Sequence, residues 1–275
     1  RAGLPTPTWR KLYGGVQPTK SRAVQVTDNC GMLEDYAEVD KALVDMAGNP
    51  ASFRLQEDRP HIEGLNQQVA TTLFYGDESV NAERFTGFAP RFNSLSAANG
   101  ENIISGGGSG SDNGSIWLVC WSPQTCHGII PKGSSAGISQ RDLGEVTIEN
   151  VDGNNGRMQA YRSHYRWDVG LSVRDWRYVV RIANIDRSAL TYNAASGARL
   201  NDLMHQAVTQ LPASLGRCVW YMDRSMLSML QRQTSSAVSS STLTMDNVGG
   251  TMQTSWGGYP VRRVDALKVN EATIS

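Results

Sequence analysis

The chain has 275 residues, of which 40% are hydrophobic, so it can form a hydrophobic core without disulfide staples. Its 26 basic and 26 acidic side chains balance, which disfavours a protein that binds nucleic acid through a broad basic surface. Twenty-one of the basic residues are arginines, the residue suited to fixed bidentate contacts with protein carboxylates.

The four cysteines show no paired C-x-x-C spacing, so we expect reduced, mostly buried thiols in a cytoplasmic setting and no zinc site. No apolar run reaches the length of a membrane span, and the first thirty residues lack the apolar core of a signal peptide. Neither a membrane protein nor a secreted one is indicated. The chain begins with Arg1 and not Met, from which we expect that an upstream segment is missing.

Residues 1–30 are predicted to form a long polar hairpin. Gly14-Gly15 separates two extended segments whose prolines and charges are typical of exposed strands. Two strands bury too little apolar area to be stable alone, so we expect the hairpin to lie on another part of the fold or on a partner. An ordinary surface hairpin is the alternative.

A long helix is predicted over Pro50–Tyr75, with Asn49 as its cap, Pro50 in the first helical position and Gly76 as its end. Pro60 predicts a kink or a restart within it. Residues 77–115 are predicted to be loops and short elements that end in a flexible Gly/Ser run unable to pack. Buried strands are predicted around 116–121, 128–130 and 146–148.

Residues 161–186 contain five arginines and five large aromatic residues. Residues 161–173 alternate with a period of two, which predicts a half-buried strand. The phase inverts after Arg174-Asp175, which predicts a bulge or a corner before a second strand. Since the arginines share polar faces with Asp168 and Asp175, and the aromatics lie on the other face, direct nucleic-acid readout is disfavoured.

The last third alternates helix and strand. An amphipathic helix is predicted from Leu200 to Leu211, ended by Pro212, followed by a strand over 217–222 and a second helix capped by Asp223. A Ser/Thr-rich link at 234–242 precedes a strand and turn around 256–261. The whole pattern predicts a mixed α+β protein without a βαβ repeat.

Gly133–Gly137 matches the G-x-S-x-G nucleophile elbow around Ser135, with His164 and His205 as conceivable bases. The flanking residues do not resemble the strand and helix that an elbow requires, so a Gly/Ser turn is the preferred interpretation. Cys120, Cys126 and His127 lack a fourth metal ligand, and the glycine run lacks the Gly-Lys-Ser/Thr that holds phosphates. We therefore expect no enzyme activity, no metal and no cofactor.

Several stretches together resemble the major capsid proteins of tailed bacteriophages, in particular a branch of short-tailed phages like epsilon15. The residues that carry this resemblance are 9–18, 24–34, 72–76, 84–91, 116–119, 173–186 and 258–267. The strongest of these is VRDWRYVVRIANID at 173–186.

The resemblance implies the Hong Kong 97 (HK97-like) α+β capsid fold, with its elements either in the founding order or in a permuted order. It would consist of an extended hairpin loop, a long spine helix, a long-stranded peripheral sheet and an axial α/β domain. The corresponding ranges are 1–30 for the extended loop, 31–76 for the spine-helix region, 77–115 for loops, 116–186 for peripheral strands and 187–275 for the axial domain.

The resemblance further implies self-assembly as pentamers and hexamers into an icosahedral head, built in the bacterial cytoplasm and retained in the virion. Its contents would be double-stranded DNA held without sequence-specific contacts, and its further partners scaffolding, portal and decoration proteins. The residues expected at contacts between subunits are Trp9, Arg10, Lys11, Tyr13, Arg162, Arg166, Arg174, Arg177 and Arg181. The alternatives are an encapsulin-like nanocompartment shell and a serine hydrolase that uses Ser135.

Overall fold

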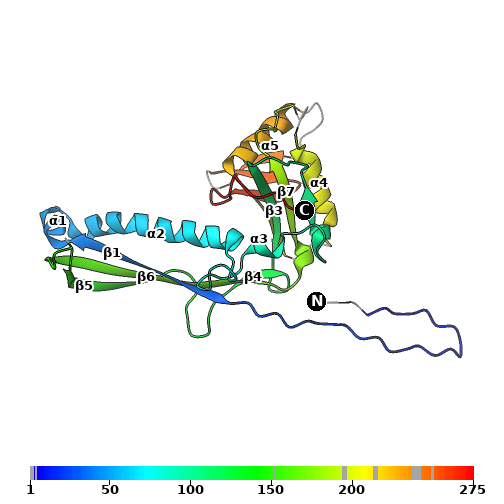
Figure 1. Cartoon of the computed structure of the whole chain (residues 1–275), viewed down its shortest axis with the longest axis horizontal. Helices are drawn as coiled ribbons and strands as arrows, with labels where there is room; N and C mark the ends of the chain where they lie inside the picture. Colours follow the sequence, from blue (N-terminus) through cyan, green and yellow to red (C-terminus); the bar gives the residue numbers. More distant parts are fainter. Residues whose placement is uncertain are drawn as a thin grey trace.

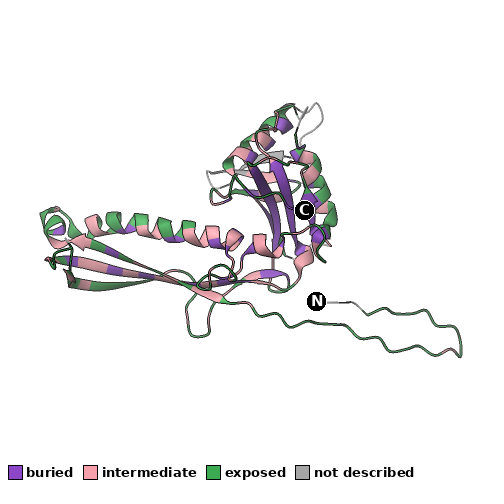
Figure 2. Cartoon of the chain, viewed as in Figure 1, coloured by how far each residue is buried: buried purple, intermediate pink, exposed green. Residues whose placement is uncertain are grey.

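The computed structural model describes residues 3, 5–151, 153–193, 197–212, 216–236, 243–248 and 251–275. An elongated arm, a compact body and an N-terminal segment that extends away from both make up the molecule (Figure 1). The buried residues lie mainly in the body, whereas the N-terminal segment is exposed along its length (Figure 2).

The arm is an antiparallel sheet covered on one face by a helix. Strand β6 (Arg157–Val173) lies in the middle and pairs with β1 (Cys30–Asp40) on one side and β5 (Ser139–Glu149) on the other. Helix α2 (Pro50–Tyr75) runs along the sheet, and the short helix α1 (Lys41–Met46) closes the far end (Figure 1). Leu65 of α2 packs against Ala37 and Tyr165 to form a small core in the arm.

Helix α2 begins and ends where the sequence predicts. The Asn49 side chain accepts a hydrogen bond from Ser52 N at 3.2 Å, and the amide of Gly76 bonds to Thr72 O at 2.8 Å. A Cβ at Gly76 would lie 2.3 Å from the carbonyl oxygen of Phe85, which explains the need for glycine there. The helix continues through Pro60, so the predicted restart at that residue is wrong.

The body is the other half of the same sheet. Strand β3 (Asn113–Trp121) pairs antiparallel with β7 (Val179–Asp186) and β8 (Arg217–Met222), and β11 (Tyr259–Arg263) joins β8 in parallel. The remaining strands extend or bridge this sheet: β2 (Ile103–Ser105), β4 (Cys126–Ile129), β9 (Leu243–Val248) and β10 (Thr251–Trp256). Strand β4 pairs with both β3 and β6 and so connects the body to the arm.

Two hydrophobic layers cover the sheet of the body. Helices α4 (Leu200–Gln210) and α5 (Arg224–Ser236) pack on one face, where Met204 and Leu230 contact the core that contains Leu118 of β3. On the other face, aromatic side chains surround Trp117, including Phe74 from the end of α2 and Phe88 from α3 (Phe88–Arg91). The end of the arm helix is therefore part of the core of the body.

The predicted strand at 161–173, the break at Arg174-Asp175, the helix at 200–211 and the strand at 217–222 are confirmed. The break is a 3-10 turn, η2 (Trp176–Tyr178), between β6 and β7. Residues 237–242 of the expected Ser/Thr-rich link lie outside the described residues, and α5 includes its first residues.

Counting the restart at Pro60, four predictions differ from the structure. Cys120 and Cys218, paired opposite each other on β3 and β8, form a disulfide, so only Cys30 and Cys126 are free thiols. Strand β5 is largely exposed, because it forms the edge of the arm. Strands β3 and β7 lie in the body with α4 and α5, whereas β6 lies in the arm.

The fourth difference is the Gly/Ser run, which packs along β7 instead of lying free. Gly106 N and Gly108 N donate to the carbonyl oxygens of Ala183 and Asn184, each at 2.7 Å. A Cβ at Gly108 would lie 2.6 Å from the amide nitrogen of Asp186. The glycines therefore allow two backbones to approach closely, a role that composition alone does not distinguish from flexibility.

Candidate assembly surface

The N-terminal loop, residues 5–27, is the most exposed part of the described chain. Gly3 and Arg22 exchange two backbone hydrogen bonds of 3.2 Å, and Gly14 N bonds to Lys11 O at 3.0 Å, so the loop folds back on itself at its tip. Trp9, Leu12 and Tyr13 are 105%, 85% and 106% exposed. These large apolar side chains do not pack against the described part of their own chain, which is typical of a surface that binds a partner.

Two contacts fix the position where the loop leaves the body. Arg91 pairs with Asp28 at 2.8 Å and also donates to the carbonyl oxygen of Thr86 at 3.2 Å. The side-chain amide of Asn29 donates to Glu78. The root of the loop is thus held firmly while its tip extends away (Figure 1).

Charged pairs cross from β6 to β1 on the face of the arm opposite α2. Arg162 lies 2.6 Å from Glu38, and Arg166 lies 3.5 Å from Glu34. His164 stacks on Tyr36, with ring centroids 4.6 Å apart. The strand register places these side chains on one surface, since residues two apart point to the same side.

Two aspartates that accept hydrogen bonds from arginines, Asp168 and Asp175, have lowered pKa values. Hydrogen bonds from Arg166 and from the Ser134 hydroxyl hold the pKa of Asp168 below its ordinary value. Hydrogen bonding from Arg177, at 2.9 and 2.7 Å, likewise lowers the pKa of Asp175 at the corner between β6 and β7. The carboxylates that we expect beside these arginines therefore belong to the same chain.

Arg174 donates to the carbonyl oxygen of Pro123 at 3.1 Å and is exposed beside the corner. The predicted contact residues thus fall into separate groups on the molecule. Trp9, Arg10, Lys11 and Tyr13 gather at the tip of the loop, Arg162 and Arg166 lie on the arm, and Arg174 and Arg177 lie at the corner.

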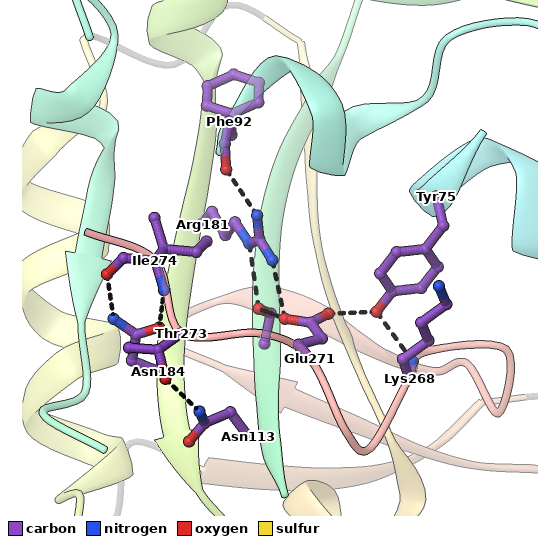
Figure 3. Close-up of polar contacts among 10 residues, drawn as sticks. Tyr75, Phe92, Asn113, Arg181, Asn184, Lys268, Glu271, Thr273 and Ile274 are labelled. Atoms are coloured by element: carbon purple, nitrogen blue, oxygen red, sulfur yellow. Dashed lines mark hydrogen bonds and ion pairs between the residues drawn. The ribbon is translucent and has the colours of Figure 1, made fainter. Parts of the chain in front are cut away.

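Arg181 has an internal role and is unavailable to another subunit. Its guanidinium lies 2.8 Å from Glu271, donates to the carbonyl oxygen of Phe92 at 2.6 Å and to the Ser115 hydroxyl at 3.1 Å (Figure 3). The residue is 4% exposed. The Tyr75 hydroxyl donates to the same Glu271, and burial together with this carboxylate raises the pKa of Tyr75.

The C-terminal segment, residues 264–275, connects the pieces of the body as a strap. Asn184 exchanges two hydrogen bonds of 2.8 Å with the backbone of Ile274 (Figure 3). Glu271 N donates to Asn113 O at 2.9 Å. The backbone of Ser275 accepts from Leu95 N at 3.2 Å. The sequence pattern gives no sign of this segment, because its buried apolar side chains, Leu267 and Ile274, follow no regular period and its other contacts are polar.

The structure does not support a nucleophile elbow at Ser135. This serine is exposed in the connection between β4 and β5, and the element that follows is a strand and not a helix. Within the part of the chain that the structure describes, no three His, Cys, Asp or Glu side chains group as metal ligands. Among the same residues, no helix has the length and apolarity needed to cross a membrane.

The family model for major capsid protein GP7 matches residues 1–275 of the chain. The chain belongs to the major capsid protein GP7 family. A solved structure entitled "Validated Near-Atomic Resolution Structure of Bacteriophage Epsilon15 Derived from Cryo-EM and Modeling" is 40% identical, with a TM-score of 0.70. The match covers 100% of this chain and 83% of that one. A search of curated proteins found no match.

This capsid protein is therefore a structural component of the virion, as the resemblance of its sequence implies. The expected mixed α+β fold is confirmed in its coarse form by the match to a phage structure. An exposed loop and an arm with one open face are the surfaces through which such a protein could contact its copies.

Proposed function

We propose that this capsid protein assembles as pentamers and hexamers into an icosahedral head that encloses double-stranded DNA. The single observation that carries the proposal is the N-terminal loop, whose apolar side chains at Trp9, Leu12 and Tyr13 are almost fully solvated in the isolated chain. Leaving these side chains in water costs free energy that association with a neighbouring copy recovers.

The arrangement also favours an HK97-like fold in its details. Helix α2 would be the spine helix, the arm sheet the peripheral domain, and residues 1–30 the extended loop that reaches a neighbour. Strands β3, β7 and β8 with helices α4 and α5 would form the axial domain, so its border differs from the simple division at residue 187. A permuted order of elements remains part of the proposal.

The balanced charge of the chain supports a shell that surrounds DNA without gripping it. Many phosphate contacts would require a large excess of basic residues and would make binding strongly salt-dependent. We therefore propose no sequence-specific DNA contacts. Scaffolding, portal and decoration proteins complete the proposed set of partners.

Sedimentation and electron microscopy of the purified chain test the proposal. We expect closed shells with five- and six-fold capsomers, and DNA inside particles taken from infected cells. A 30 kDa monomer at all protein concentrations would contradict assembly. Particles filled with protein cargo would instead support the encapsulin-like alternative.

A further inference from the structure

We propose that Trp9 of one copy inserts into a pocket at the root of the N-terminal loop of the next copy, guided by charge. This inference rests on the proposed assembly and names the contact that the loop makes. It follows from three features of the chain: an uneven distribution of charge, an aromatic anchor without a partner, and a pocket of matching character.

Charge is divided unevenly along the chain although its total is zero. Residues 1–27 contain five basic side chains and no acidic one, so residues 28–275 carry a net charge of −5. The four basic residues of the described loop are all exposed, and none forms an ion pair within the described chain; they are Arg10, Lys11, Lys20 and Arg22. The loop is thus a basic segment suited to an acidic receiving surface.

The receiving surface lies beside the turn at residues 77–84. This turn carries three carboxylates and one basic residue, Arg84, and the described salt bridges include none of the three, which are Asp77, Glu78 and Glu83. Glu83 borders a pocket of about 180 Å³ between the start of β1 and the second half of α2. Its lining includes the apolar side chains of Leu33, Val69, Phe85 and Val169, and its polar lining includes Arg84 beside Glu83.

The pocket and the tip of the loop are complementary, since each combines an apolar part with a charged part. An aromatic side chain held in an apolar pocket with a charged rim is the usual form of an interface anchor. Trp9 is followed directly by Arg10 and Lys11, so an indole in the pocket would bring these two cations to the rim that carries Glu83.

Trp9 cannot fill the pocket of its own chain in this conformation. The pairing of Gly3 with Arg22 and of Lys11 with Gly14 places Trp9 opposite Val16, twelve residues from the root of the loop at Asp28. Twelve extended residues span roughly 40 Å. The pocket begins at Gly31, next to the root, and the loop extends away from it (Figure 1).

A loop on one copy that binds the root of the next copy makes a head-to-tail contact. Such contacts use two different surfaces and produce a closed ring when the rotation between copies divides a full turn. Each copy carries one loop and one pocket, so every copy in a ring would donate and receive once. This geometry is the one that pentamers and hexamers require.

Cysteine cross-linking in assembled particles tests the contact. In a Cys30→Ser background, which removes the partly exposed free thiol, Thr8→Cys is combined with Gln68→Cys in the pocket wall. The matched control combines Thr8→Cys with Gln56→Cys, which lies roughly 18 Å farther along α2. Particles are oxidised, and the products are separated by non-reducing electrophoresis.

We expect a ladder of linked multimers with Gln68→Cys and monomers with Gln56→Cys. Adding Trp9→Ala should remove the ladder, whereas Trp9→Phe should retain it. Intact particles without a ladder, or with equal ladders in both combinations, would overturn the proposed contact while leaving assembly in place. Failure of the unmodified chain to form particles would instead refute the proposed function, so the two failures are distinguishable.

Discussion

Arg181 and Glu271 lie 2.8 Å apart with side-chain exposures of only 5% and 6%, and they connect strand β7 to the C-terminal strap. The pair does not stand alone, since Ser115, Tyr75 and the backbone of Phe92 occupy the remaining hydrogen-bonding positions. A buried ion pair that is fully hydrogen-bonded specifies one arrangement of the surrounding elements. Here it joins the end of the arm helix, the central strand and the chain terminus.

Removal of one partner of this pair should be strongly destabilising. Because Glu271→Gln leaves a buried guanidinium without its counter-charge, we expect a loss of about 3–5 kcal/mol in the free energy of unfolding. Asp265→Asn is the matched control, since its partners Arg224 and Arg263 are 67% and 55% exposed. Urea unfolding measures the free energy of unfolding of both variants. Equal losses in the two variants would show that burial does not make the Arg181–Glu271 pair more important for stability than an exposed pair.

The disulfide between Cys120 and Cys218 should contribute substantially to stability, because it closes a separation of 98 residues. Loop-closure entropy predicts a gain of about 4–5 kcal/mol for a loop of this size. We expect the double variant Cys120→Ala/Cys218→Ala to unfold at lower urea concentration than the wild-type chain, and reduction of the wild-type chain to produce most of the same shift. Cys30→Ser serves as the control.

A thiol titration under denaturing conditions gives a second measurement. The oxidised chain should show two free thiols, from Cys30 and Cys126. Four free thiols in protein from mature particles would contradict the pairing and would restore the reduced state that the sequence suggested.

Individual helices and strands of this fold could be predicted from the sequence, whereas the strands and helices that pack beside them could not. Helix α2 could be predicted because Asn49, Pro50 and Gly76 mark its ends through local chemistry. Strand β6 could be predicted from its period, but the period does not say which strands lie beside it. The separation of β6 from β7 into arm and body depends on pairing with distant residues.

The predicted contact residues also show that the sequence pattern does not reveal which distant residues a side chain contacts. Arg177 and Arg181 occupy similar positions in the strand pattern, yet one pairs locally with Asp175 and the other is buried against Glu271, ninety residues away. Nothing in the strand pattern distinguishes them, since Glu271 lies in a segment without periodicity. The loop residues Trp9 and Tyr13 could be singled out because a two-stranded hairpin has no core of its own.

The glycine run offers a direct test of packing against flexibility. A Cβ at Gly108 would meet the backbone of Asn184 and Asp186 at 2.7 and 2.6 Å, so Gly108→Ala should destabilise the chain by about 1–3 kcal/mol. Gly64, in the exposed part of α2, has no atom within 4 Å of its Cβ position, and Gly64→Ala should stabilise by about 0.5–1 kcal/mol. Thermal unfolding of the two variants should therefore shift in opposite directions. A neutral Gly108→Ala would show that the run is flexible after all.

Charge exchange on the arm separates folding from assembly. Arg162 pairs with Glu38 at 2.6 Å across β6 and β1, and both side chains remain about one-third exposed, at 29% and 33%. Arg162→Glu alone places two like charges opposite each other, which destabilises a strand pair. The exchange Arg162→Glu/Glu38→Arg restores the pair within the chain but reverses the charges that the open face presents to a neighbour.

We therefore expect the exchanged variant to regain the thermal stability of the wild-type chain while it still assembles poorly, because the proposed contact between subunits depends on which strand carries the positive charge. Sedimentation measures assembly, and the DNA affinity of the unassembled chain provides a second readout that should not change. Full assembly of the exchanged variant would limit Arg162 to a role inside its own arm. A loss of DNA affinity without a loss of assembly would instead place the arginine face toward the packaged DNA.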